Sequence, residues 1–223
     1  MIPATGLVLY FTRCNAPARS KEWAEWLREE HVPTLAELPC VRAATHCALA
    51  QQPTPGMPSV GFSHVTLLEV TGDVDEAAGF LRVPHDRLQV ANALHPNHCV
   101  MNVDVLEAHG RWNQKTIPTQ ELTGHIMAYV MCNDPRLEAE WDAWNDEMHM
   151  PDMLRSDGFS GLSRWRRVSP SGSGPQFLTL YDVGPIGVDE AVKRSAAIMP
   201  GLVEAGRKHP SHVGGLTITL TRN

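Results

Sequence analysis

The sequence predicts an α+β protein built from two tandem βαββαβ modules, the ferredoxin-like order, packed sheet against sheet. Two observations lead to this prediction. A stretch rich in tryptophan and histidine occurs twice, and the predicted strands on either side of it occur twice in the same order. The 223 residues are 43% hydrophobic and 20% charged, which is typical of a globular chain with one large domain or two smaller ones.

The net charge and the cysteine content indicate which binding partners and which cellular compartment to expect. A net charge of −6 argues against a nucleic-acid surface, which needs a basic patch. No apolar run is as long as a membrane span, and the N-terminal residues are typical of a first strand rather than a signal peptide. The five cysteines are odd in number and have no CxxC spacing. This disfavours a disulfide framework or zinc ribbon and indicates a cytoplasmic protein.

The repeated stretch is WAEWLREEHVP at Trp23–Pro33 and WDAWNDEMHMP at Trp141–Pro151. Internal repeats decide the fold prediction before any other pattern. The same residue types recur at the same spacings: Trp23/Trp141, Trp26/Trp144, Glu29/Glu147, His31/His149 and Pro33/Pro151.

The rest of the chain follows the same order in both halves. Apolar, β-prone runs bounded by turn residues predict four strands in each half. They lie at 6–11, 41–50, 64–70 and 99–106, and again at 124–129, 159–168, 177–183 and 214–221. We therefore predict an N-terminal module at 1–110, a linker at 111–123 and a C-terminal module at 124–223.

Helices are predicted over the repeated stretch and again from Val74 and Val188. Because a proline disfavours the helical conformation of the residue before it, the first helix of each module should end or kink near His31 and His149. A histidine at a helix C-terminus would have its protonated form favoured. Pro84 and Pro200 should interrupt the second helices in the same way.

The motif WxxWxxExHxP, followed by a turn and a strand, occurs at 23–41 and 141–159. On these residues the chain resembles the dimeric α/β-barrel superfamily, and within it the EthD-like proteins. The resemblance implies an intramolecular α/β barrel formed by the two fused modules, with a pocket between helices and sheet near each motif histidine. Relatives are associated with isomerisation, cyclisation, dehydration, decarboxylation, quinone-forming oxygenation and, in distant branches, haem chemistry.

His31 and His149 are the first catalytic candidates, because an unperturbed histidine exchanges protons near neutral pH. Glu29 and Glu147 are expected to orient them or act with them. The competing interpretation is structural: these side chains would cap a broken helix. His64 is a further catalytic candidate, since it shares a strand face with Thr66 and Leu68 and could line the same pocket. A hydrogen-bonded core histidine is the alternative there.

Aromatic side chains are expected to form the wall of a small-molecule site. The substrate-binding candidates are Trp23, Trp26, Tyr10, Trp141, Trp144, Tyr129 and His98. His98 belongs to one of two HPxH sequences, His95–His98 and His209–His212. We interpret these as helix-ending turns and predict no metal site, because no cysteine or carboxylate cluster accompanies them at a known spacing.

The function expected from these residues is that of a cofactor-independent lyase, isomerase or cyclase using histidine acid/base catalysis. Its substrate would be a small aromatic, polyketide-like or lactone molecule. No nucleotide-binding, hydrolase or zincin motif occurs. Two alternatives stay open: an oxygenase, either cofactor-free or haem-dependent, and a non-catalytic small-molecule binder. Further association into a homodimer is also left open.

Overall fold

A computed structural model describes residues 4–50, 60–79, 81, 94–110, 119–168 and 175–222. The chain divides into two compact units. Unit 1 consists of 1–108, 167–169 and 223, and unit 2 consists of 109–166 and 170–222. The predicted loop at 51–59, the proline at position 84 and most of the predicted linker lie outside the described residues.

Each unit contains a four-stranded antiparallel sheet. Unit 1 has the strand order β4-β1-β3-β2, and unit 2 has the equivalent order β8-β5-β7-β6. The strands occur where the sequence predicted them, with small changes at their ends. They are β1 (Gly6–Cys14), β2 (Val41–Leu49), β3 (His64–Val70), β4 (His98–Ala108), β5 (Gly124–Cys132), β6 (Gly161–Arg167), β7 (Phe177–Val183) and β8 (His212–Arg222).

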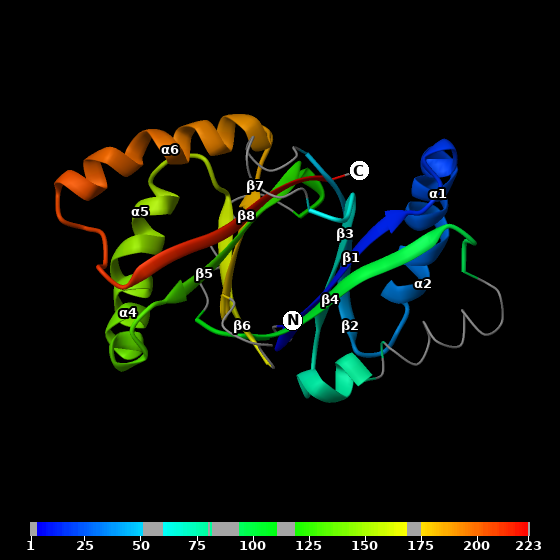
Figure 1. Ribbon diagram of the computed structural model, residues 1–223, viewed down its shortest axis with the longest axis horizontal. Coiled ribbons are helices and arrows are strands. Elements are labelled where there is room, and N and C mark those ends of the chain that lie inside the picture. Colours follow the sequence, from blue (N-terminus) through cyan, green and yellow to red (C-terminus); the bar gives the residue numbers. More distant parts are fainter. Residues whose placement is uncertain are drawn as a thin grey trace. The chain divides into compact units, whose positions relative to one another are not determined.

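The helices of each unit lie on one side of its sheet (Figure 1). Unit 1 has η1 (Pro17–Arg19), α1 (Ser20–Trp26), η2 (Leu27–His31), α2 (Val32–Ala36) and a helical segment at 74–79. Unit 2 has η3 (Thr119–Glu121), η4 (Pro135–Leu137), α4 (Glu138–Trp144), η5 (Asn145–His149), α5 (Met150–Leu154) and α6 (Val188–Glu204).

The core of each unit lies between this helical layer and the sheet. In unit 1, Val8 and Leu68 of adjacent strands pack with Leu35 of α2. In unit 2, Ile126 and Val183 pack with Met150, Met153 and Val188 in the same way. Because side chains alternate along a strand, every second residue of β1, β3, β5 and β7 faces this helical layer.

The first strand of each module begins with glycine because the backbone has no room for a side chain there. A Cβ atom at Gly124 would lie 2.1 Å from the carbonyl oxygen of Leu220, and one at Gly6 would lie 2.8 Å from the side chain of Val74 and 3.0 Å from the carbonyl oxygen of Leu106. Only glycine allows such a close approach of two strands. The repeated glycine therefore has a packing function.

The helix over the repeated stretch does not end near His31 or His149, so this one of the two predicted outcomes was wrong. The helix continues through a π-helical turn, in which the amide of Val32 bonds to the carbonyl of Leu27 and that of Met150 to the carbonyl of Asn145. Pro33 and Pro151 follow directly, inside α2 and α5. The wider turn accepts a residue without an amide hydrogen and relieves the clash of its ring with the preceding turn.

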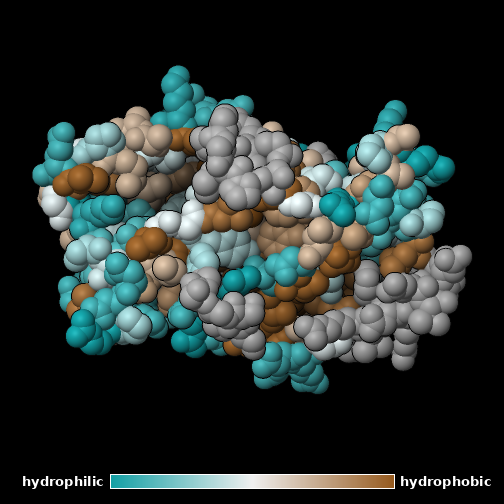
Figure 2. Space-filling view, in the orientation of Figure 1, coloured by the Kyte–Doolittle hydropathy of each residue, from teal (hydrophilic) through white to brown (hydrophobic). Residues whose placement is uncertain are grey.

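The last helix is also not split at Pro200, which was one of the two outcomes predicted there. α6 runs continuously from Val188 to Glu204 with Pro200 inside it. Much of this helix is at the surface, and hydrophobic side chains occur there among polar ones (Figure 2). Val192 and Val203 are 38% and 52% exposed. No helix among the described residues is long and apolar enough to cross a membrane.

Candidate functional site

The π-helical turn stacks the second tryptophan of each motif on the motif histidine. Trp26 and His31 have ring centroids 4.9 Å apart at an interplanar angle of 21°, and Trp144 and His149 are 4.8 Å apart at 13°. Residues five apart lie on one face only because the turn is wider than an α-helical turn. The spacing of the repeated motif is therefore explained by the local backbone geometry.

The first tryptophan of each motif is fully buried and is bonded to the second histidine of the HPxH sequence. The indole nitrogen of Trp23 donates to Nδ1 of His98 over 3.1 Å, and that of Trp141 to Nδ1 of His212 over 3.2 Å. An indole nitrogen only donates, so Nδ1 of each histidine accepts. These two histidines therefore carry their hydrogen on Nε2 when neutral.

The first histidine of each HPxH sequence stabilises a turn. Nδ1 of His95 accepts a hydrogen bond from the amide of Asn97, and Nδ1 of His209 accepts one from the amide of Ser211. The lone pairs at these nitrogens are thus already used. In the described ranges, no three histidine, cysteine or carboxylate side chains are grouped as a metal site.

Each unit thus has a frame of two tryptophans and the histidines that contact them. In unit 1, the sheet adds two more histidines to this frame. His46 of β2 and His64 of β3 stack in parallel, with centroids 5.1 Å apart and an interplanar angle of 4°. Trp23 meets the His64 ring at 4.9 Å in an edge-on contact. We call Trp23, Trp26, His31, His46, His64 and His98 the unit 1 cluster.

The two sheet histidines differ in their access to solvent. His46 is 6% exposed, and both of its ring nitrogens are buried without a hydrogen-bond partner among the described residues. Nδ1 of His64 lies 3.0 Å from the hydroxyl of Ser63. Nε2 of His64 has no hydrogen bond to a described residue, and the residue as a whole is partly exposed.

Burial keeps these histidines neutral. It lowers the pKa of His64 to about 4, and burial together with the nearby His64, Arg28 and His31 lowers that of His46 to about 4. In unit 2, burial lowers the pKa of His149 to about 4, aided by His212. This is opposite to the expectation from a helix C-terminus, because His149 lies within a continuous helix and is largely removed from water.

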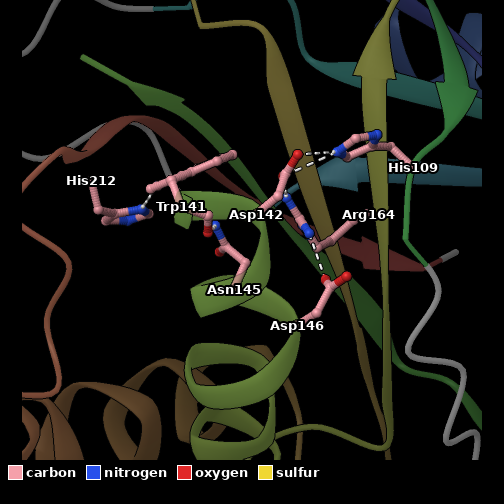
Figure 3. Close-up of polar contacts among 7 residues, drawn as sticks. All are labelled: His109, Trp141, Asp142, Asn145, Asp146, Arg164 and His212. Carbon is pink, nitrogen blue, oxygen red and sulfur yellow. Dashed lines mark hydrogen bonds and ion pairs between the residues drawn. The ribbon is translucent and has the colours of Figure 1, made fainter. Parts of the chain in front are cut away.

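Unit 2 has a charged network at the equivalent positions. Arg164 replaces His46 and Phe177 replaces His64. Arg164 is 2% exposed and donates to Asp142 over 2.6 Å and to Asp146 over 2.5 Å (Figure 3). Nε2 of His109 lies 3.1 Å from both oxygens of Asp142. Burial opposes ionisation of Asp142, but bonds from His109 and Arg164 give it a net lowered pKa.

The two predicted glutamates are exposed, whereas the two predicted tyrosines are buried. Glu29 is exposed and paired with Arg28, and Glu147 is exposed on η5. Neither has a hydrogen bond to a motif histidine among the bonds described for these residues, and their catalytic role stays a prediction. Tyr10 is 7% exposed, packs in the core of unit 1, and its hydroxyl lies 3.4 Å from the carbonyl of Leu81. Tyr129 is 6% exposed on β5.

Sequence reasoning did not identify His46 and Arg164 as site residues, nor the acidic partners of Arg164. A signal was present in the alignment of the two halves. His46 and Arg164 occupy matching strand positions, and the helical residues Ala24 and Arg28 match Asp142 and Asp146. The acidic side chains thus occur only in the half that has arginine on the strand.

His64 has the features of a metal-bound imidazole. Burial lowers its pKa to about 4, its Nδ1 is held by a hydroxyl group, and its Nε2 has no hydrogen bond to a described residue. Ligating histidines commonly have the second nitrogen held by an oxygen in this way.

No family model matches the chain, and no curated protein matches it either. Solved structures do. A protein of Fusobacterium nucleatum described as a "putative monooxygenase" has 11% identity and a TM-score of 0.62, with 100% of this chain and 94% of that chain covered. A mutant chlorite dismutase from Candidatus Nitrospira defluvii has 9% identity and a TM-score of 0.57, with 100% and 93% covered.

A third similar structure is a DypB variant of Rhodococcus jostii in complex with haem. It has 8% identity and a TM-score of 0.54, with 100% of this chain and 94% of that chain covered. At such identities the likeness establishes the fold alone. The chain therefore has the fold of these solved structures.

These neighbours correct the functional prediction. They are named for monooxygenase, chlorite dismutase and dye-decolorizing or peroxidase activity, which are oxidative or haem-dependent. The expectation of a cofactor-independent lyase, isomerase or cyclase was therefore wrong, and the oxygenase alternative agrees better. The lowered pKa values of His64 and His149 supply a physical reason, because acid/base catalysis works best with a pKa near the working pH.

Proposed function

We propose that the chain is an oxygenase with its reactive site at the unit 1 cluster, and that it uses haem. The observation that carries this proposal is the environment of His64: a neutral imidazole in a partly exposed residue, with Nδ1 held and Nε2 without a hydrogen bond to a described residue. The oxidative activities named for structures of the same fold support it.

The ionisation state of His64 favours ligation over proton transfer. With a pKa of about 4, neutral imidazole exceeds the protonated form roughly a thousandfold at pH 7. A base this weak removes a proton from a weak acid only at a large energetic cost. A neutral imidazole is, however, the form that binds iron.

Each residue of the unit 1 cluster would have a separate role in binding the haem. His64 would hold the iron through Nε2, Ser63 would orient the imidazole through Nδ1, and Trp23 would support its ring. Trp26 and His31 would form an aromatic wall beside the site. Haem, when bound, would supply the chemistry of dioxygen or peroxide activation.

A titration of the purified protein with haemin tests this proposal. The wild-type protein should develop a Soret band at one haem per chain and then oxidise a phenolic test substrate with peroxide or dioxygen. His64→Ala should lose both responses. His109→Gln removes a histidine outside the cluster and is the matched control; it should behave as the wild type. A wild-type protein without haem binding would overturn the haem assignment.

A second candidate is an oxygenase without a cofactor. It is favoured by the aromatic character of Trp23, Trp26 and His31, which suits a planar substrate. Such a substrate would itself reduce dioxygen: a CH₂ group and O₂ give a C=O group and water. Dioxygen consumption by a haem-free and metal-free sample, lost in His64→Ala, would support this candidate instead.

We further propose that the two units arose by tandem duplication of an EthD-like βαββαβ module. Matching motifs, matching strand orders and the repeated tryptophan–histidine contacts support the duplication. The EthD-like relationship rests on the sequence motif alone. Association into a homodimer is also a proposal, which light scattering of the purified protein would test.

A further inference from the structure

We propose that His46 is a positioning residue, which holds the ring plane of His64 by stacking on it inside the unit 1 cluster. This inference rests on the proposed function of His64. Three contacts would then fix the orientation of the His64 imidazole: the parallel ring of His46, the edge of Trp23 and the hydroxyl of Ser63. Only Nε2 is left to act.

The burial of His46 is the reason to look for a role. Both of its ring nitrogens are removed from solvent with no hydrogen-bond partner among the described residues. Burying polar atoms without partners is unfavourable, so an apolar side chain would serve better as simple core filling. A residue kept in this state is expected where its ring contributes something other than stability.

The stacked geometry indicates what that contribution is. The rings of His46 and His64 are parallel to within 4°, whereas Trp23 meets His64 at 78°. A parallel ring and a steeply inclined ring, both within 5.1 Å of the His64 centroid, restrict rotation of the His64 side chain. Coordination of a metal by imidazole is directional, because the lone pair lies in the ring plane, so a fixed ring raises affinity by removing an ordering cost.

Packing of the His46 ring on His64 also covers one face of the His64 ring and keeps water from it.

Two variants of His46 distinguish the effect of its aromatic ring from the effect of its ring nitrogens. His46→Ala removes the ring, and His46→Phe keeps an aromatic ring without nitrogens. Proton NMR of the haem-free protein gives the midpoint pH at which the His64 ring titrates. We expect this midpoint to be close to the wild-type value in His46→Phe and clearly higher in His46→Ala. The signal that disappears in His64→Ala assigns the resonance. His46→Gln is a ringless substitute if the alanine variant does not fold.

Haemin affinity gives the second measurement. We expect binding about tenfold weaker in His46→Ala and within about threefold of the wild type in His46→Phe, since tenfold is a modest loss for an ordering effect. Unchanged His64 titration and unchanged affinity in His46→Ala would overturn the proposal. If the wild type binds no haemin, the haem assignment fails, but the NMR comparison still decides whether His46 positions His64.

Discussion

Units 1 and 2 use one frame to support two different polar centres. In both, a buried indole donates to the second HPxH histidine, and the motif histidine stacks on the second tryptophan. The sheet positions beneath this frame differ. Unit 1 has two neutral histidines, whereas unit 2 has a buried arginine with two carboxylate partners. We therefore propose that the exchangeable sheet residues determine the chemistry, while the shared tryptophan–histidine contacts support them.

The first test of this comparison gives unit 1 the phenylalanine that unit 2 has at the matching position. His64→Phe should abolish haemin binding and peroxide-dependent turnover, a loss of at least about a hundredfold, because the Nε2 atom is removed. The protein should stay folded, since Phe177 occupies the matching position with 2% exposure. Absorption spectra and circular dichroism measure the two effects. Phe177→His is the matched control and should leave both unchanged; retained turnover in His64→Phe would contradict the account.

The second test removes the buried positive charge of Arg164 in unit 2. Arg164→Leu should lower the free energy of unfolding by about 2–4 kcal/mol, because Asp142 and Asp146 lose a buried partner. Denaturant unfolding measures this loss. Adding Asp142→Ala, the residue that unit 1 has at position 24, should recover part of the stability. Haemin binding by unit 1 should be unaffected, and a large loss there would show that the two centres are coupled.

The third prediction concerns pH and is smaller. His46 and His64 have folded-state pKa values of about 4, below the ordinary value of 6.5. Between these values the unfolded chain binds protons that the folded chain does not, so stability should fall as pH decreases from 6.5 to 4. His64→Phe should reduce the slope of stability against pH by about one proton in this range. An unchanged slope in urea unfolding curves would show that His64 is not held neutral.

The strands and the repeat could be predicted because their signals are local. Runs such as His64–Val70 and Phe177–Val183 are apolar, β-prone and bounded by turn residues, and the structure has strands at these same residues. The glycines at positions 6 and 124 mark the start of equivalent strands. These features depend on neighbouring residues in the sequence and need no knowledge of tertiary contacts.

The helices and the site were harder to predict for a physical reason. A proline usually ends a helix, but a π-helical turn before Pro33 and Pro151 accommodates it, and nothing in the local pattern indicates this turn. Stacking of His46 on His64 depends on the register of two strands, in which Ala48 faces His64. The pKa of His64 depends on burial, which follows from the fold and not from the sequence around it.

The most direct test of the central claim is a crystal structure of the protein prepared with haemin. We predict haem in unit 1, with Nε2 of His64 bound to the iron and Nδ1 still at the hydroxyl of Ser63. Haem bound to His149 in unit 2, or a complex in which His64 makes no contact with the iron, would contradict the assignment of the reactive site to the unit 1 cluster.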